Sequence, residues 1–270
     1  MPHFHSAAST LAKSSPVLLA LDTSTEACSV ALCVGEREFF RYELAPRLHT
    51  ALVLPMVTAV CEEAGIALSA IEAIAFARGP GAFTGLRIAA GVVQGLAYGL
   101  QVPVISVSTL AVMAHRAWRE RGWNAVHTAI DARMGEVYFG SYRVEGAGRV
   151  ALVGREVVAP LAELLACAQL VDSEEAALVG EGPASKTISV DSLRAGGWTG
   201  YGSGWVYREA LQQQLPDVVD LQVEGYPHAL DLLALGRVMF AAGEYVNAEN
   251  ALPVYLRDSV VQVKEQVKSH

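Results

Sequence analysis

Runs of positive charge are absent from this sequence, which has 20 Lys and Arg against 28 Asp and Glu over 270 residues, a net charge of −8. The acidic excess is confined to the second half, because residues 1–123 hold 9 basic and 9 acidic side chains whereas residues 124–270 hold 11 and 19. Affinity for RNA depends on Lys and Arg that displace counterions from the phosphates. The composition therefore argues against a protein that binds RNA by itself and predicts that any contact with RNA needs a partner.

Metal-binding and nucleophile motifs are also missing. No CxxC pair is present, and no two of the seven histidines have the HxxxH spacing that places two ligands on one face of a helix. No serine lies in a GxSxG motif, so a hydrolase triad has no support. The four cysteines are predicted to be small buried thiols in a reducing compartment: Cys28, Cys33, Cys61 and Cys167.

Neither a secretory signal nor a membrane span is predicted. Residues 1–16 lack a basic start and an unbroken apolar core, so we expect a flexible polar extension and a cytoplasmic protein without membrane contact. No charged side chain lies between Arg87 and His115, but glycines, glutamines and Pro103 interrupt this stretch. A buried helix followed by a buried strand explains it better.

Periodicity predicts alternating strands and helices. Hydrophobic residues are 52% of the chain, enough for one large or two compact domains. Residues 17–44 read as a three-stranded meander, and the helical spacing from Thr50 to Ala64 ends at Gly65. The Gly- and Ser-rich stretch 180–205 is predicted to be a long loop. Further strands and helices are expected up to Arg78 and at about 79–99, 102–107, 108–120, 125–144 and 228–243.

Two strand–turn segments resemble each other, because Asp22 ends an apolar strand in ALDTST and Asp131 does so in TAIDARM. The similarity suggests two halves built on one plan, at residues 17–122 and 123–270. Actin-like folds hold a Mg-nucleotide between two such hairpins, with turn amides and hydroxyls facing the phosphates and a carboxylate facing the waters of the metal. The alternative is that both aspartates only form Asx turns. The candidates for a vestigial nucleotide site are Asp22, Thr23, Ser24, Thr25 and Asp131.

The stretch GPGAFTGLRIAAGVVQGLAYG, residues 79–99, begins like a phosphate-binding loop. Its glycines fit GxGxxxG and it lacks the GK[ST] ending of a P-loop, so a nucleotide prediction from them is weak. Thr84 is a candidate N-cap of the helix that follows. A tight turn into a buried helix explains the loop equally well.

Three glycines recur at spacing four in that helix, which is otherwise almost wholly apolar: Gly91, Gly95 and Gly99. Each glycine costs roughly 1 kcal/mol of helix stability relative to alanine. The expected compensation is the close approach of a second helix on the glycine face. The sequence leaves open whether that helix belongs to this chain or to another.

Four segments carry a resemblance to a known family: LALDTSTEACSVAL, RGPGAFTGLRIAAGVVQGLAYG, IDARMGEVYFGSY and LPVYLRD. Over residues 17–258 the chain resembles the bacterial TsaB family, also called YeaZ, of partner proteins in threonylcarbamoyladenosine biosynthesis. The resemblance implies an α/β, actin-like (ASKHA) fold of two related domains, each with a mixed sheet flanked by helices. It also implies a place in the machinery that modifies adenosine beside the anticodon of tRNAs reading ANN codons.

The resemblance further implies that a related subunit, TsaD, performs the transfer and that TsaE contributes ATPase activity. Members of the family form homodimers alone and pair with TsaD through helices of the first domain. We therefore expect a non-catalytic subunit that meets tRNA only through the complex and has no cofactor of its own, with ATP or ADP considered only at the interface with TsaD. The expected partner interface is Thr84, Arg87, Ala90, Gly91, Gln94, Gly95, Tyr98 and Gly99.

The catalytic relative carries its metal-binding HxxxH just after the strand that follows the glycine-bearing helix. Aligning strand ends puts Thr109 and Met113 there, and a hydroxyl and a thioether cannot replace two imidazoles. Two alternatives remain: a nucleotide-dependent actin-like enzyme, favoured by Asp22 and Asp131, and a glycoprotease-like metallopeptidase, for which the histidines are missing. Residues 1–16 and the loop at 182–205 are not expected in the family core, so no role is carried over to them.

Overall fold

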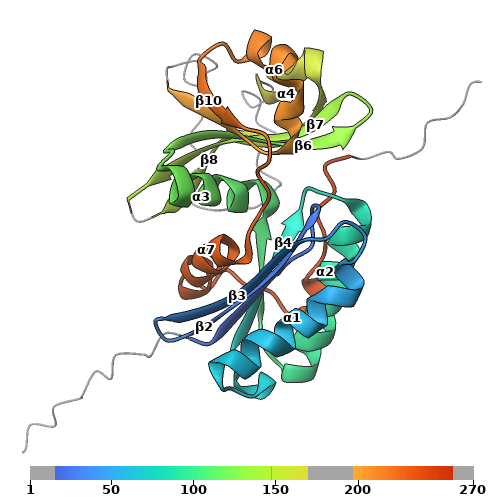
Figure 1. Cartoon of the computed structure of the whole chain (residues 1–270), viewed down its shortest axis with the longest axis vertical. Coiled ribbons are helices and arrows are strands. Elements are labelled where there is room, and N and C mark those ends of the chain that lie inside the picture. The colour runs from blue at the N-terminus through green and yellow to red at the C-terminus, as the bar shows by residue number, and fades with distance from the viewer. Residues whose placement is uncertain (1–15, 147, 170–196, 258–270) are drawn as a thin grey trace, which may run out of the picture.

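The structure is a computed structural model that describes residues 16–146, 148–169 and 197–257. The predicted extension at 1–16, apart from its last residue, and residues 180–196 of the predicted loop lie outside these ranges. Two five-stranded mixed sheets lie one above the other in Figure 1, with helices against both.

The first sheet has the strand order β3-β2-β1-β4-β5. Its first three strands form the predicted meander, with β1 antiparallel to β2 and β2 antiparallel to β3, while β4 and β5 run parallel to β1. All five residues of β1 are buried, which makes it the centre of the sheet. The strands are β1 (Leu18–Asp22), β2 (Ala27–Val34), β3 (Arg37–Leu44), β4 (Ala73–Gly79) and β5 (Val104–Ser108).

The second sheet repeats this plan in the order β10-β9-β6-β7-β8. Its central strand β6 is antiparallel to β7 and parallel to β9, so β6 corresponds to β1. The repeat confirms the expected fold class, two related mixed sheets flanked by helices. The strands are β6 (Ala125–Arg133), β7 (Glu136–Glu145), β8 (Arg149–Pro160), β9 (Trp198–Tyr201) and β10 (Val218–Gln222).

Two helices cover the outer face of the first sheet, α1 (His49–Ala64) and α2 (Phe83–Leu100). The predicted stop at Gly65 is confirmed, because this residue adopts the left-handed conformation with φ 71°. The predicted N-cap at Thr84 is wrong: α2 starts at Phe83, so Ala82 holds the cap position without a side-chain hydrogen bond. On the second sheet lie the short helices α4 (Leu164–Gln169) and α6 (Arg208–Gln214).

Two further helices are exchanged between the halves and lie between the sheets in Figure 1. The helix α3 (Thr109–Arg121) follows β5 but packs on the second sheet, where Met113 and Ala117 join a core cluster with Val126. The helix α7 (Ala229–Ala241) follows the second sheet but packs on β1 and β2 of the first. The chain therefore returns to the first sheet at its end, and the division at residue 122 stays a prediction.

The predicted loop is wrong for its last part, because Trp198–Tyr201 form strand β9 between β6 and β10. Both Trp198 and Tyr201 are fully buried. The glycines here serve close packing, since a methyl group on Gly200 would overlap the ring of Trp205. Four short 3-10 helices complete the described elements: Leu68–Ala70, Leu161–Glu163, Ser203–Tyr207 and Ala248–Asn250.

The cysteines are free thiols; Cys28, Cys33 and Cys61 are buried as predicted, and Cys167 is half-buried. Within the ranges given above, no helix has the length and apolar character needed to span a membrane.

Candidate partner-binding face and interdomain cleft

The glycine face of α2 is open. A methyl group built on Gly91, Gly95 or Gly99 would meet no other atom within 4 Å, and all three residues are exposed. Among the residues that the structure describes, no helix covers this face. The question that the sequence left open is therefore answered for the described chain: it does not supply the second helix itself.

The eight predicted interface residues divide into three groups. Six are exposed and share one face by their helical spacing, and Tyr98 among them is 75% exposed. Gln94 is half-buried and its Nε2 donates to the carbonyl oxygen of Ala251 at 3.2 Å. Ala90 is turned to the core of the first sheet. The six exposed residues are Thr84, Arg87, Gly91, Gly95, Tyr98 and Gly99.

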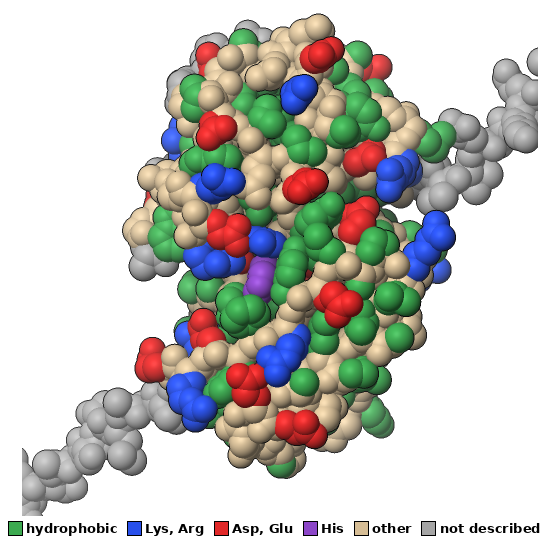
Figure 2. All heavy atoms as spheres, viewed as in Figure 1, with side chains coloured by type: hydrophobic (Ala, Val, Ile, Leu, Met, Phe, Trp, Pro, Cys, Tyr) green, Lys and Arg blue, Asp and Glu red, His purple; other side chains and the backbone are tan. Residues whose placement is uncertain are grey.

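The neighbouring helix α1 adds exposed apolar side chains that the sequence reading did not single out. Leu48, which precedes this helix, is 54% exposed and Leu54 is 48% exposed. Helices α1 and α2 contact each other, and Figure 2 shows apolar side chains at the surface over this region. The sequence did contain a sign of this: Leu54 is apolar but lies outside the helical spacing of the buried residues Val53, Met56 and Val57.

The turn at residues 22–25, DTST, is covered by the glycine-containing loop at residues 79–82, which precedes α2. The Oγ1 of Thr23 donates to the carbonyl oxygen of Gly85 at 2.7 Å, and the amide of Ala82 donates to the carbonyl oxygen of Ser24 at 2.7 Å. A methyl group on Gly81 would overlap the carbonyl oxygen of Ser24, and one on Gly85 would overlap the carbonyl oxygen of Thr23. The two glycines therefore allow one backbone to pack directly on another, and Asp22, Thr23 and Ser24 are fully buried.

Asp22 forms an Asx turn at this place. Its Oδ1 accepts a hydrogen bond from the amide of Ser24 at 3.1 Å, while Oδ2 has no partner among the described residues. Burial raises the pKa of Asp22 from 3.8 to about 6, and hydrogen bonding from Ser24 offsets only part of this rise. The ionised carboxylate therefore destabilises the folded chain at neutral pH.

Replacing Asp22 by asparagine is expected to stabilise the protein at neutral pH, because it removes the buried charge and keeps an oxygen that accepts from Ser24. The folded pKa lies above the unfolded one, so the penalty is full above about pH 6 and vanishes as the pH falls below about 4. Urea unfolding at pH 8 should show a gain of roughly 1–3 kcal/mol, with none at pH 4. The matched control is Asp131→Asn, which should give no gain. An equal gain there would contradict the claim that the buried charge of Asp22 destabilises the fold.

Asp131 forms the corresponding turn in the second half. Its Oδ1 accepts from the amide of Arg133 at 2.8 Å and from the hydroxyl of Tyr207 at 3.3 Å, while Oδ2 pairs with Nη1 of Arg133 at 3.0 Å. Both aspartates thus make Asx turns, which was the alternative to the nucleotide interpretation. A nucleotide role for these turns stays a prediction.

A cavity of about 1060 Å³ lies between the two halves, next to both turns. The C-terminal segment, residues 251–257, forms part of its wall. The amide of Val254 donates to the carbonyl oxygen of Arg78 at 2.8 Å. Arg257 donates to the carbonyl oxygen of Ala132 at 3.2 Å and to the carboxylate of Glu136. This segment therefore ties the first half to the second. Aromatic and charged lining residues include Phe83, Arg87, Asp131, Arg133, Tyr138, Tyr226, Tyr255 and Arg257.

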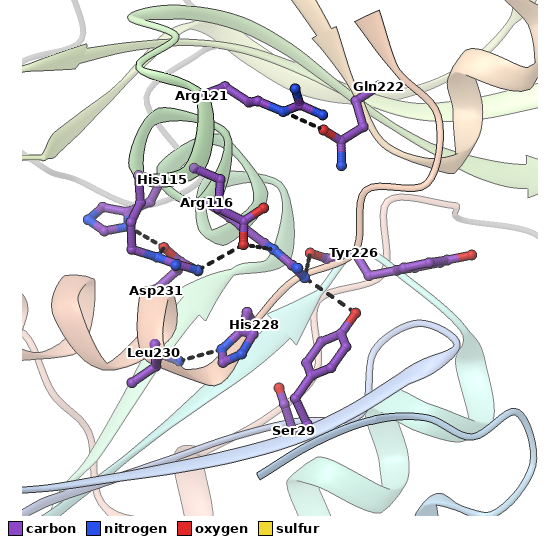
Figure 3. Close-up of polar contacts among 12 residues, drawn as sticks. Ser29, His115, Arg116, Arg121, Gln222, Tyr226, His228, Leu230 and Asp231 are labelled. Atoms are coloured by element: carbon purple, nitrogen blue, oxygen red, sulfur yellow. Dashed lines mark hydrogen bonds and ion pairs between the residues drawn. The ribbon is translucent and has the colours of Figure 1, made fainter. Parts of the chain in front are cut away.

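The helices α3 and α7 meet through a buried ion pair (Figure 3). The carboxylate of Asp231 is fully buried and receives Nε and Nη2 of Arg119 at 2.8 and 2.7 Å and Nδ1 of His115 at 2.7 Å. Burial acts to raise the pKa of Asp231, but the bonds from Arg119 and His115 outweigh it and lower the pKa. His115 is thus a hydrogen-bonded residue of α3.

Next to this pair, His228 caps the start of α7, with Nδ1 accepting from the amide of Leu230 at 3.1 Å (Figure 3). Its ring stacks on Tyr42 with centroids 4.8 Å apart. Burial, and then the charge of Arg116, lowers the pKa of His228 to about 4, so the ring is neutral and able to accept at pH 7. His228 therefore fixes the start of α7 against the first sheet.

The positions aligned with the metal-binding histidines of the catalytic relative are buried in this chain. Thr109 and Met113 are both fully buried at the start of α3. In the described part of the chain, no three His, Cys, Asp or Glu side chains lie close enough to hold a metal ion together.

Comparison with known proteins points in one direction. A family model described as TsaD, tRNA N6-adenosine threonylcarbamoyltransferase, matches residues 42–264. The tRNA threonylcarbamoyladenosine biosynthesis protein TsaB of Escherichia coli K12 is 40% identical over 92% of this chain and 97% of its own length, and that of Haemophilus influenzae is 35% identical over 92% and 96%. A solved structure of YeaZ from Pseudomonas aeruginosa is 49% identical, with a TM-score of 0.74 over 89% of this chain and 100% of its own.

Proposed function

This chain belongs to the TsaB family, and on that premise we propose that it is a non-catalytic docking subunit in tRNA threonylcarbamoyladenosine biosynthesis. It would act by pairing with a TsaD-like catalytic subunit through α2 and meet tRNA only as part of that complex. A TsaE-like ATPase as a further partner, a homodimer of the isolated chain and a cytoplasmic location belong to the same proposal.

One observation carries the proposal: the glycine face of α2 is exposed and nothing described in the chain covers it. Three glycines within one helix cost helix stability, and a helix that packs closely against them would offset that cost. The six exposed residues of the predicted interface include one charged side chain, Arg87, so most of this face is suited to a partner's apolar surface. The buried Thr109 and Met113 also support a role without group transfer.

The test is the substitution Gly95→Leu. The side chain enters open space in the isolated chain, so the fold should persist, but it would fill the groove that the partner helix needs. We expect the affinity for the catalytic subunit, measured by calorimetry, to fall by about 100-fold or more, as for a hot-spot position.

The matched control is Gln212→Leu, which adds a leucine at an exposed position of α6 on the other half. This variant should pair normally. Unchanged co-elution of the Gly95→Leu variant with the catalytic subunit would contradict the proposed interface.

A nucleotide-dependent role is the second candidate, and the cavity beside both turns is the observation in its favour. The buried Asp22 and Thr23 weigh against it, because neither faces the cavity. Calorimetry with Mg-ATP distinguishes two binding places. The isolated chain reports on the cavity beside the turns, and the complex reports also on the interface with the catalytic subunit. Heat with the isolated chain would support this candidate.

A further inference from the structure

One arginine of the docking face is held in a fixed position. Arg87 lies at the N-terminal end of the row that continues with Gly91 and Gly95, at spacing four. Its guanidinium carbon lies 3.7 Å from the centre of the Phe83 ring, and its Nε donates to the hydroxyl of Tyr255 at 3.2 Å. The rings of Phe83 and Tyr255 are themselves in contact, with centroids 5.5 Å apart.

The position of Tyr255 is set by backbone bonds of the C-terminal segment. Its neighbour Val254 is bonded to Arg78 at the end of β4, and Ala251 accepts from Gln94 on α2. Arg257 anchors the far end of the segment on the second half. Because both sides of Tyr255 are tied down, its hydroxyl stays at a fixed place relative to α2.

The outer edge of the Arg87 guanidinium is free. Its Nη1 and Nη2 make no hydrogen bond or ion pair with any described residue. The other two arginines that line the cavity differ, since Arg133 pairs with Asp131 and Arg257 pairs with Glu136. Arg87 is also the one charged side chain of α2. It is therefore an exposed cation, already ordered, on a helix that carries no other charged side chain.

We propose that Arg87, held by Phe83 and Tyr255, receives a carboxylate of the partner subunit, and that Tyr255 is a positioning residue for this contact. The inference rests on the proposed docking function. A guanidinium offers two parallel donors to a carboxylate, and an arginine that is ordered before binding loses less side-chain entropy when the contact forms. A protein carboxylate fits better than RNA phosphates, because phosphate binding relies on several cations and α2 offers one.

The test compares Arg87→Ala, Arg87→Lys, Tyr255→Phe and the double variant Arg87→Ala/Tyr255→Phe in binding to the catalytic subunit, by calorimetry at low and high salt. Arg87→Ala should weaken binding about 30-fold and reduce its dependence on salt. Arg87→Lys should lose nearly as much, because an ammonium cannot make the forked contact. Tyr255→Phe should weaken binding roughly 3- to 10-fold.

The double variant separates a positioning role from a merely structural one. If Tyr255 acts through Arg87, Tyr255→Phe should add nothing in the Arg87→Ala background. Matched controls are Arg208→Ala and Tyr245→Phe, which alter an exposed arginine and a half-exposed tyrosine outside the docking face and should bind as the wild type does.

Two results would overturn the inference without touching the docking proposal. Normal binding of Arg87→Ala, in a preparation where Gly95→Leu abolishes pairing, would show that Arg87 meets no carboxylate. Normal pairing of Arg87→Ala combined with weaker tRNA binding by the assembled complex would show that it meets a phosphate. Normal pairing of Gly95→Leu, in contrast, would remove the docking face itself.

Discussion

The substitution Gly85→Ala is expected to destabilise the protein by about 4 kcal/mol or more, enough to remove most of a typical free energy of unfolding. The new methyl group would overlap the carbonyl oxygen of Thr23, which is buried backbone and cannot rotate away. Relief requires α2 to move off the DTST turn, which would break the bond from Thr23 to Gly85 and the bond from Ala82 to Ser24. Urea unfolding and the soluble yield measure the effect.

Gly95→Ala is the matched control, since it makes the same change in the same helix where no atom lies within 4 Å. It should be neutral or stabilise the isolated chain by up to about 1 kcal/mol through helix propensity. Similar stabilities for the two alanine variants would show that α2 does not pack directly on the turn.

The second large effect is expected for Arg119→Met, which leaves the fully buried carboxylate of Asp231 with His115 as its remaining partner. Removing one partner of a buried ion pair typically costs about 3–5 kcal/mol, and the lower end applies because Arg119 is itself partly exposed. The loss should appear as a lower midpoint in urea at pH 7. Arg121→Met is the control, since that side chain bonds the half-buried Gln222 and no carboxylate.

The dependence on pH distinguishes the ion pair from simple packing. The folded pKa of Asp231 is lowered, so the pair contributes stability above the unfolded pKa near 4, and this contribution is lost as the pH falls through the folded pKa. The difference between wild type and Arg119→Met should therefore be largest near neutral pH and shrink in acid. A deficit that stays constant down to pH 3 would point to lost packing contacts instead.

Much of the fold could be predicted because local chemistry determines it. Gly65 ends α1 in the left-handed conformation, and the two strand–turn–strand segments around Asp22 and Asp131 form equivalent hairpins. The exchange of α3 and α7 could not be predicted, since helical periodicity shows which face of a helix is apolar but not which sheet will cover it. Met113, which follows the first sheet in the chain, therefore packs on the second sheet, and Leu232, which follows the second sheet, packs on the first.

Glycine is the residue type whose role was hardest to infer. Gly81 and Gly85 lie against the backbone of the DTST turn, whereas Gly91 and Gly95, a few residues later, face open space. Gly200 belongs to a buried strand although its surroundings resemble a loop. For Gly81 and Gly85 the decisive neighbours, Ser24 and Thr23, are distant in sequence, so the glycines themselves give no local sign of their role.

Only part of the candidate site could be predicted, because helical spacing is local whereas packing depends on distant residues. Helical spacing alone places six of the eight proposed residues on one exposed face. The burial of Ala90 depends on the sheet beneath α2, and the bond from Gln94 to Ala251 joins residues 157 apart. Tyr255 lies in the LPVYLRD segment that contributed to the family resemblance, but its contact with Arg87 is visible only in the structure.

The most direct test of the central claim measures the modification of tRNA by this chain alone, by the catalytic subunit alone and by both together, with donor supplied to each. The account predicts full modification by the pair, none by this chain alone, and loss of its contribution in the Gly95→Leu variant. Repeated turnover by the isolated chain would contradict it, because the transfer centre would then lie in this protein and not in its partner.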